Sequence, residues 1–225
     1  MKLLAIIPAY NEQDCIVETI RELDRVAPDV DILVINDGST DGTGDLCRRE
    51  GYNFLDLPVN VGLSSGFQAG MKYADRQGYD CAIQFDADGQ HRPEYIKPLL
   101  EAMEQSGADI VIGSRFVTKK KDVSARMAGS ALISFLIRLT TGKRLSDPTS
   151  GMRMYNRRAM AEFVKRYDFG PEPDTLANLI RKGFKVVEVQ VEMRDRETGE
   201  SYLSFSKSIM YMARAFVSIL IVQWL

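Results

Sequence analysis

Residues 81–90, Cys-Ala-Ile-Gln-Phe-Asp-Ala-Asp-Gly-Gln, set a short apolar run directly before two aspartates and a glycine. The run 81–85 predicts a buried strand, because it is short, apolar and bounded by polar residues. Asp86 and Asp88 follow that strand at its carboxyl end. Ligands of open α/β sheets bind at this end of the strands, so the stretch links the fold to a candidate site.

Short apolar runs alternate with amphipathic stretches throughout the first half of the chain. Further strands are predicted over residues 3–7, 31–35, 54–57 and 110–112, and helices over residues 14–26, 43–50, 65–76 and 94–105. Strands of this length separated by helices indicate βαβ units. Such units build a mostly parallel sheet with helices on both faces, so the predicted fold class is α/β.

The second half is less regular and ends in an apolar tail. Helices are predicted over residues 124–140, 158–166 and 175–182, and strands over residues 152–155 and 186–191. Residues 209–225 are almost wholly apolar. We therefore expect one domain over residues 1–200 and a C-terminal apolar helix within residues 201–225.

Composition favours one globular domain and excludes several kinds of site. The chain has 225 residues, of which 45% are hydrophobic and 27% charged, as in folded globular proteins. A net charge of -2 gives no general attraction to nucleic acid. Cys15, Cys47 and Cys81 share no metal-ligand spacing and are expected to be free thiols. A single histidine, His91, excludes a multi-histidine metal site.

Asp86 and Asp88 predict a site for a divalent cation. Two carboxylates at positions i and i+2 turn toward one point where the backbone bends, and Gly89 favours a bend there. Oxygen ligands suit Mg²⁺ or Mn²⁺ shared with substrate phosphates, and Gln90 offers a third oxygen. Such an ion would neutralise charge on a diphosphate leaving group. The alternative is an aspartate-rich turn that caps the next helix.

Polar residues also follow the first two strands. The first strand runs into Pro-Ala-Tyr-Asn-Glu at 8–12, and the second into Asp-Gly-Ser-Thr-Asp-Gly at 37–42. Tyr10 is placed to stack on a base, and Asp37 to accept hydrogen bonds from a nucleobase or ribose. The alternatives are a core aromatic for Tyr10 and a simple turn with a helix N-cap for the second segment.

Taken together, these motifs resemble the family 2 glycosyltransferases of the GT-A fold. The resemblance covers roughly residues 1–160. It rests on residues 8–12, on Val-Ile-Asn-Asp-Gly-Ser-Thr-Asp-Gly-Thr at 34–43, on Asn-Val-Gly at 60–62, on residues 85–90 and on Gly-Ser-Arg at 113–115. Within the family the chain is similar to the polyprenyl-phosphate sugar synthases, which share a segment like Ser-Asp-Pro-Thr-Ser-Gly-Met-Arg at 146–153.

The resemblance implies a role for each matching residue. The nucleoside site would be lined by Pro8, Ala9, Tyr10, Glu12 and Asp37. The divalent metal, and through it the diphosphate, would be held by Asp86, Asp88 and Gln90. Phosphate would be contacted by the catalytic arginines Arg115 and Arg126, with Ser130 one turn further along the same helix. The acceptor phosphate or the sugar would be met by Ser130, Arg153, Glu172, Asp174, Arg196 and Ser201.

Two of these segments leave alternatives open. Arg196 and Ser201 match an Arg-x-x-Gly-x-Ser element of this branch that usually continues with lysine, but Tyr202 follows here. Whether Lys207 replaces that lysine stays open. Glu172 and Asp174 could act as a base or orient the sugar, or they could belong to a proline-rich turn at a helix start.

The implied activity is an inverting, metal-dependent transfer of a hexosyl or N-acetylhexosaminyl group. The donor would be a UDP- or GDP-sugar, and the acceptor a polyprenyl phosphate used in cell-wall or surface glycan assembly. A phosphate with a second pKa of about 6 is largely anionic at neutral pH, so arginines need only position it.

Three other functions compete with this interpretation. A transferase with a glycan hydroxyl acceptor would need a general base. A sugar nucleotidyltransferase would favour a glycine- and arginine-rich first loop, which residues 8–12 do not provide. A non-enzymatic binding module would not need paired aspartates.

Because a polyprenyl acceptor lies in a membrane, the protein is expected at the cytoplasmic face of the cell membrane, bound peripherally or anchored by its C-terminus. The tail of 17 residues at 209–225 is shorter than the about 20 apolar residues of a spanning helix. Docking on an anionic bilayer is expected to use this tail, the basic residues Lys119, Lys120 and Lys121, and the apolar residues Met127, Ala131, Leu132, Phe135, Leu136 and Leu139. Core packing, a homo-oligomer interface or a small membrane protein partner are the alternatives.

Overall fold

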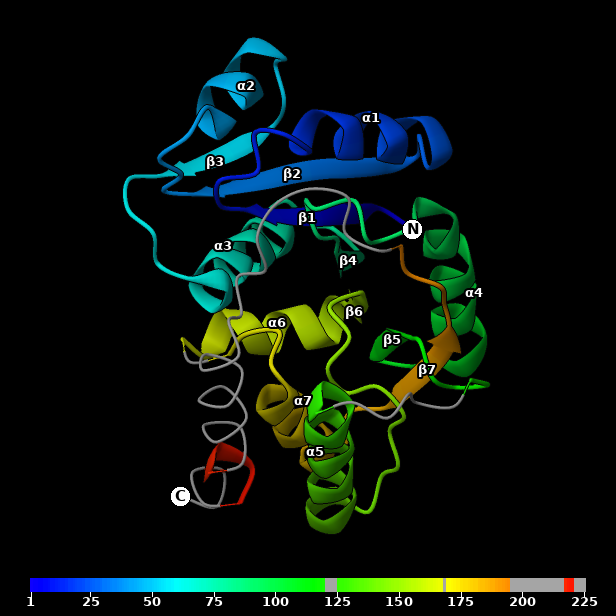
Figure 1. The fold of residues 1–225 in the computed structure, drawn as a ribbon. Coiled ribbons are helices and arrows are strands. Elements are labelled where there is room, and N and C mark those ends of the chain that lie inside the picture. Colours follow the sequence, from blue (N-terminus) through cyan, green and yellow to red (C-terminus); the bar gives the residue numbers. More distant parts are fainter. Residues whose placement is uncertain (120–124, 168, 195–216, 221–225) are drawn as a thin grey trace.

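The structure is a computed structural model, and it describes residues 1–119, 125–167, 169–194 and 217–220. Within them, seven strands form one sheet with helices packed on both of its faces (Figure 1). The predicted α/β class is confirmed.

The sheet has the strand order β3-β2-β1-β4-β6-β5-β7. Neighbouring strands are parallel except where β6 runs antiparallel to β4 and β5. The sheet is therefore mostly parallel, as predicted. The strands are β1 (Leu3–Ala9), β2 (Val30–Asp37), β3 (Phe54–Leu57), β4 (Cys81–Gln84), β5 (Ile110–Ser114), β6 (Arg153–Asn156) and β7 (Val186–Gln190).

Two apolar clusters lie on opposite faces of the sheet. One cluster packs against α1 (Ile16–Val26), α2 (Thr43–Arg49) and α4 (Ile96–Ser106), which a 3₁₀ turn at Pro93–Tyr95 precedes. The other includes side chains of α3 (Leu63–Arg76), α5 (Ala125–Thr141), α6 (Arg157–Lys165) and α7 (Pro173–Arg181). Alternate residues of the buried strands serve the two clusters, because successive side chains of a strand point to opposite faces.

Most predicted elements are present, and their boundaries differ by one or two residues. Strand β5 extends past the predicted residue 112 to Ser114, so Arg115 directly follows the carboxyl end of this strand. Helix α3 begins two residues early, at Leu63, because Gly62 adopts a φ of 84° at its N-cap position, a conformation that favours glycine. The described cysteines are free thiols, as expected, and burial raises the pKa of Cys81 to about 12.

The predicted apolar face of residues 124–140 is split between the core and the surface. Leu136 is buried, together with Ile133 and Ile137. By contrast, Leu132, Phe135 and Leu139 are 47%, 58% and 65% exposed. Helix α5 thus fills the core with one side and presents large apolar side chains on the other.

The predicted C-terminal helix is described only over residues 217–220, and these pack on the domain itself. Ile219 is fully buried in the same cluster as α7. Ser218 donates a hydrogen bond of 2.5 Å to Asp174 at the start of α7. No helix within the described parts of the chain is long and apolar enough to cross a membrane.

Candidate functional site

The carboxyl ends of the neighbouring parallel strands β2, β1 and β4 lie side by side at the same end of the sheet. The parallel registers pair Ala9 with Asn36 and Ile6 with Gln84, so the loops after these strands emerge on the same side. This places the two predicted nucleoside segments, residues 8–12 and 37–42, beside Asp86 and Asp88.

Asp86 is held on several sides just after β4. Its side chain is 35% exposed, and Gln84 donates a hydrogen bond of 3.1 Å from Nε2 to Asp86 Oδ1. The N–H of Asp86 donates to Nδ1 of His91 at 2.9 Å, and His91 Nε2 lies 3.4 Å from Asp86 Oδ2.

Asp88 and Gln90 lie beside it in the same turn. Asp88 is 8% exposed, and its Oδ1 accepts the N–H of Gln90 at 3.1 Å. The Gln90 side chain donates to the carbonyl oxygen of Arg194 at 3.3 Å. Arg194 in turn pairs with Glu22 through two contacts of 2.7 Å. This anchoring turns the amide nitrogen of Gln90 toward Arg194 and leaves its amide oxygen for a ligand.

These residues fit a divalent cation that also binds substrate oxygens. No group of three or more His, Cys, Asp or Glu side chains in the described ranges is arranged to hold a metal. Two carboxylates and an amide are an incomplete oxygen set, which suits Mg²⁺ or Mn²⁺ shared with a diphosphate. Gly151 supports the fit, because a Cβ there would lie 2.9 Å from Asp86 Oδ2, so the chain leaves room for that carboxylate.

Arg115 and Ser130 are brought together by the segment before β6. Asp147 is fully buried and receives two side-chain hydrogen bonds from Arg115. Asp147 Oδ1 also accepts the hydroxyl of Thr149 at 3.1 Å, and Thr149 Oγ1 lies 3.3 Å from Ser130 Oγ. The backbone of Arg126 belongs to α5, but its side chain lies outside the described part of the structure.

Arg153 lies inside the protein, just after the segment of residues 148–150. It is 2% exposed, and it donates to the carbonyl oxygens of Ser150 at 2.9 Å and Pro148 at 2.6 Å. The guanidinium therefore holds residues 148–150 from inside the protein. Contact of Arg153 with the acceptor phosphate or the sugar stays a prediction.

The loops after β1 and β2 are locked together by hydrogen bonds. Asn11, with a φ of 57°, donates its N–H to Ser39 Oγ at 3.0 Å and accepts the N–H of Thr40 at 2.8 Å. The N–H of Glu12 donates to Thr43 Oγ1 at 2.9 Å. Pro8 is half-buried, Ala9 is buried and Tyr10 is 37% exposed, so the Tyr10 ring is accessible at this end of β1.

Asp37 acts on the loop before α3. Its carboxylate accepts the N–H groups of Val61 at 2.8 Å and Gly62 at 2.9 Å, and the residue is 5% exposed. Gly38 permits this approach, since a Cβ there would lie 2.4 Å from the nitrogen of Asn60. The Asp37 carboxylate thus holds the loop of residues 60–62, and its contact with a nucleoside stays a prediction.

Glu172 and Asp174 point to different neighbours. Glu172 accepts a hydrogen bond from Ser64 in the first turn of α3, and burial raises the pKa of its carboxyl. Asp174 accepts the hydroxyl of Ser218. Arg196 and Ser201, like Tyr202 and Lys207, lie outside the described residues.

Three residues without a predicted role surround Asp86, namely Gln84, His91 and Gly151. From the sequence, His91 indicated only that a multi-histidine site is excluded. Gly151 is 65 positions from Asp86 along the chain, so its approach to Asp86 was not predicted. The one available signal was that Gln84 and His91 flank the acidic pair closely in sequence.

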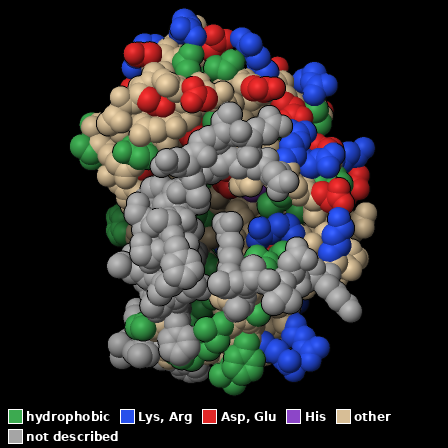
Figure 2. Space-filling view, in the orientation of Figure 1, with side chains coloured by type: hydrophobic (Ala, Val, Ile, Leu, Met, Phe, Trp, Pro, Cys, Tyr) green, Lys and Arg blue, Asp and Glu red, His purple; other side chains and the backbone are tan. Residues whose placement is uncertain are grey.

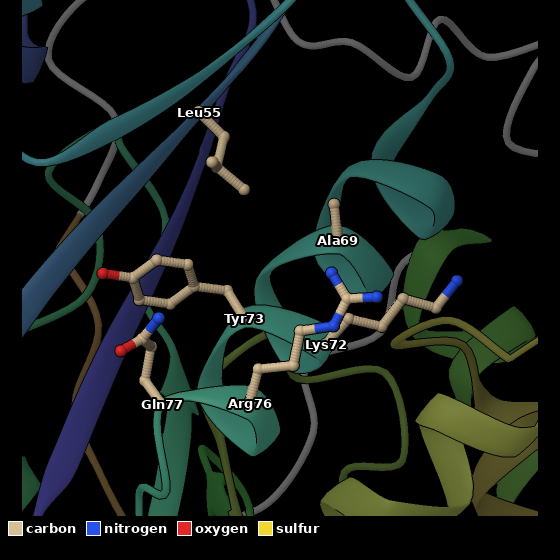
Figure 3. A pocket seen from close by; sticks show the side chains of 6 residues that line it. All are labelled: Leu55, Ala69, Lys72, Tyr73, Arg76 and Gln77. Carbon is tan, nitrogen blue, oxygen red and sulfur yellow. The ribbon is translucent and has the colours of Figure 1, made fainter.

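A separate hollow of about 320 Å³ lies between β3 and the second half of α3 (Figure 3). Its lining residues are Leu55, Ala69, Lys72, Tyr73, Arg76 and Gln77. Helix α3 starts beside the candidate site and runs away from it, so this hollow lies toward the opposite edge of the sheet. It takes no part in the site around Asp86.

Comparison with known proteins gives consistent results. Residues 4–163 match the family described as Glycosyl transferase family 2. Undecaprenyl-phosphate mannosyltransferase of Micrococcus luteus is 35% identical over 216 residues, which cover 91% of this chain and 88% of that protein. Polyprenol monophosphomannose synthase of Mycolicibacterium smegmatis is 33% identical over 220 residues, which cover 91% and 82%.

Solved structures share the fold at lower identity. Glucosyl-3-phosphoglycerate synthase from Mycobacterium tuberculosis, in complex with Mn²⁺, UDP and phosphoglyceric acid, has a TM-score of 0.68 at 16% identity and covers 97% of this chain and 77% of its own. A mannosyltransferase from Pyrobaculum calidifontis, in complex with GDP-Man and Mn²⁺, has a TM-score of 0.66 at 14% identity, with 97% and 62% covered. The predicted GT-A fold is confirmed.

Proposed function

Because this chain belongs to glycosyl transferase family 2, we propose that it transfers a mannosyl group from a nucleotide-diphosphate sugar to a polyprenyl phosphate. The observation that carries the proposal is the similarity, over 91% of the chain, to two relatives named for polyprenyl-phosphate mannosyl transfer. Two structural neighbours in complex with Mn²⁺ and a nucleotide support a divalent metal.

The donor would bind at the shared edge of β2, β1 and β4. Tyr10 is exposed enough to stack on the base, while the bonded loops of residues 10–12 and 39–43 would fix its position. Asp86, Asp88 and Gln90 would hold Mg²⁺ or Mn²⁺, which when bound neutralises charge on the departing diphosphate.

The acceptor phosphate would bind between β5 and α5. Arg115 follows the end of β5, and Asp147 fixes the plane of its guanidinium. Ser130 belongs to α5, and its hydroxyl lies 3.3 Å from that of Thr149. A phosphate that is already anionic is a nucleophile without help from a base. The reaction would therefore need no general base. This agrees with the contacts of Glu172 and Asp174, which accept hydrogen bonds from the structural hydroxyl groups of Ser64 and Ser218.

The lipid chain would run along a hollow beside these residues. The hollow, of about 360 Å³, is lined by Phe116, Lys119, Ala131, Ser134, Leu145 and Ser146. Ala131 and Ser134 follow Ser130 on α5, so the hollow lies next to the proposed phosphate position. Its apolar residues suit the first isoprene units of a lipid phosphate.

Helix α5 would face the cytoplasmic surface of the cell membrane. Figure 2 shows hydrophobic and basic side chains over α5 and the turn after it, at the lower end of the view. Leu132, Phe135 and Leu139 are exposed, and Arg138, Lys143 and Arg144 are exposed beside them. The helix carries no acidic residue. Apolar side chains flanked by cations suit an anionic bilayer.

A donor and acceptor screen tests the function. Purified full-length protein with Mn²⁺ or Mg²⁺ would be given GDP-mannose, other GDP- and UDP-sugars, and undecaprenyl phosphate. The proposal expects mannosyl transfer to the lipid phosphate and loss of turnover in EDTA. Transfer only to free sugar or glycan hydroxyls would instead favour the hydroxyl-acceptor alternative. Formation of a nucleotide sugar from a sugar phosphate would favour a nucleotidyltransferase.

A further inference from the structure

Three residues from separate positions in the fold converge on the carboxylate of Asp86. Gln84 ends β4, His91 precedes the 3₁₀ turn at Pro93–Tyr95, and Gly151 lies just before β6. Gln84 faces Asp86 Oδ1, whereas His91 and the Gly151 backbone approach Oδ2, and none of the three belongs to the proposed ligand set. Gln84 and His91 are both 2% exposed, so these two side chains act from inside the protein.

His91 binds the main chain of Asp86 and faces its carboxylate. Nδ1 accepts the N–H of Asp86 at 2.9 Å, so the ring proton is on Nε2 in a neutral imidazole. That edge of the ring lies 3.4 Å from Asp86 Oδ2. The ring is fixed from behind by Phe85, with the centroids 5.5 Å apart and the planes at 75°.

Gln84 directs its amide group to the other carboxylate oxygen of Asp86. Nε2 donates to Oδ1 at 3.1 Å. Its Oε1 is buried without a hydrogen-bond partner among the described residues, although buried polar atoms are usually paired. The amide nitrogen therefore hydrogen-bonds Asp86, while the buried amide oxygen accepts no hydrogen bond from the described residues. Such a local cost in stability is typical of functional positions.

Gly151 closes the third side by having no side chain. A Cβ at this position would lie 2.9 Å from Asp86 Oδ2, 3.4 Å from His91 Cε1 and 3.5 Å from Gln84 Nε2. The backbone thus approaches all three residues at once. Arg153 holds this segment in place through the carbonyl oxygens of Ser150 and Pro148.

We propose that Gln84, His91 and Gly151 are positioning residues that fix the Asp86 carboxylate in the orientation in which it binds a divalent cation. The inference rests on the proposed function, because it takes Asp86 as a metal ligand. Partners of this kind orient metal ligands in many proteins, and their loss commonly lowers metal affinity about 10- to 100-fold.

Mn²⁺ binding, measured by electron paramagnetic resonance with GDP present, tests the proposal without turnover. His91→Ala, Gln84→Met and Gly151→Ala should each weaken Mn²⁺ binding by about 10- to 100-fold. His91→Asn, whose side-chain oxygen can replace Nδ1 as the acceptor, should recover most of the loss. Thermal unfolding would show which variants are folded at the measuring temperature.

Asp88→Asn separates failure of this inference from failure of the metal site. If Asp88→Asn loses Mn²⁺ while folded His91→Ala, Gln84→Met and Gly151→Ala variants bind it like the wild type, the positioning role is wrong and the metal site stands. If Asp88→Asn also binds Mn²⁺ normally, the proposed metal site itself is wrong.

The imidazole signal gives a second test in the wild-type, metal-free protein. Because the chain has one histidine, the imidazole signals in the ¹⁵N NMR spectrum of a protein without a histidine tag come from His91 alone. For the neutral ring, the proposal expects the tautomer with its proton on Nε2, because Nδ1 accepts the N–H of Asp86. A neutral ring with its proton on Nδ1 would overturn it, and this outcome does not depend on whether any variant folds.

Discussion

The guanidinium of Arg115 meets the carboxylate of Asp147 at two points, with Nε 2.7 Å from Oδ2 and Nη2 2.9 Å from Oδ1. Asp147 has no exposed side-chain surface, whereas the Arg115 side chain is 30% exposed. The pair is therefore fixed at its buried end and reaches solvent at the other. A planar two-point contact holds the orientation of an arginine, so Arg115 is set toward the proposed acceptor phosphate.

Replacing Asp147 by asparagine should loosen Arg115 and weaken acceptor binding. Asp147→Asn removes the charge and one of the two side-chain contacts, so the KM for lipid phosphate should rise several-fold with a smaller change in kcat. A hydrogen bond to a charged group is worth about 1.5–3 kcal/mol, and the free energy of unfolding should fall by about that amount. Steady-state kinetics and urea unfolding measure both effects.

The exposed pair of Asp45 and Arg48 offers the control. Its side chains are 88% and 60% exposed, and such surface pairs contribute little. Asp45→Asn should leave both the KM and the unfolding curve unchanged. Equal effects of the two substitutions would show that Asp147 has no special part in placing Arg115.

Replacing Glu172 by glutamine should stabilise the protein at neutral pH. Burial is the largest cause that raises the pKa of this carboxyl from 4.5. The folded state then holds the proton more tightly than the unfolded state, so wild-type stability falls as pH rises from 4.5 through the higher folded-state pKa. Glu172→Gln removes this loss and can still accept the hydroxyl of Ser64.

Urea unfolding across the pH range from 4 to 8 checks the Glu172 prediction. The two proteins should differ least below about pH 4, where the carboxyl is protonated in both states. The gap should widen as pH increases. A variant that is less stable than the wild type at pH 7 would contradict a raised pKa as the main effect of this site.

Polar substitutions on the outer side of α5 should release the protein from membranes. Phe135→Ser combined with Leu139→Ser removes two exposed apolar side chains, and apolar burial contributes about 25 cal/mol per Å². Sedimentation with phosphatidylglycerol vesicles should show at least about a tenfold loss of binding. Turnover of a short, water-soluble polyprenyl phosphate should remain.

Tyr167→Ser is the matched control for that experiment. Tyr167 is 84% exposed, but it lies after α6 beside Lys72 of α3, away from the α5 surface. Its substitution should leave vesicle binding intact. Equal losses from both surfaces, or none from α5, would exclude α5 as the docking side.

The sequence predicted the order of elements well because burial leaves a local pattern. The runs 3–7 and 81–85 are apolar enough to indicate interior strands, and both are buried in the structure. The antiparallel direction of β6 was not predictable in the same way. Periodicity reports which side chains are buried, whereas strand direction depends on the path of the connecting segments.

The candidate site was predictable where it follows the strand ends and hidden where it depends on distant contacts. Asp86 and Asp88 lie where the strand pattern placed them. The pairing of Arg115 with Asp147 and the approach of Gly151 to Asp86 join segments 32 and 65 positions apart. No local pattern carries such contacts. Arg153 illustrates the same limit, because its interior position under residues 148–150 depends on tertiary packing that the sequence pattern did not indicate.

Asp88→Asn tests the metal assignment in solution. Loss of one carboxylate from an oxygen set of three should weaken Mn²⁺ binding and lower kcat by about a hundredfold or more, the scale seen when one electrostatic group is removed from an active site. The measurement is transfer rate against Mn²⁺ concentration. Full activity at the same metal concentration as the wild type would contradict the assignment.

The most direct measurement is the mass of the lipid product formed from GDP-mannose, with Mn²⁺, when polyprenyl phosphate and the matching polyprenol are offered side by side. Our account predicts that one hexose is added to the phosphate lipid, that the alcohol is unchanged, and that EDTA stops the reaction. Addition of hexose to the alcohol, or transfer to the phosphate at an undiminished rate without metal, would contradict it.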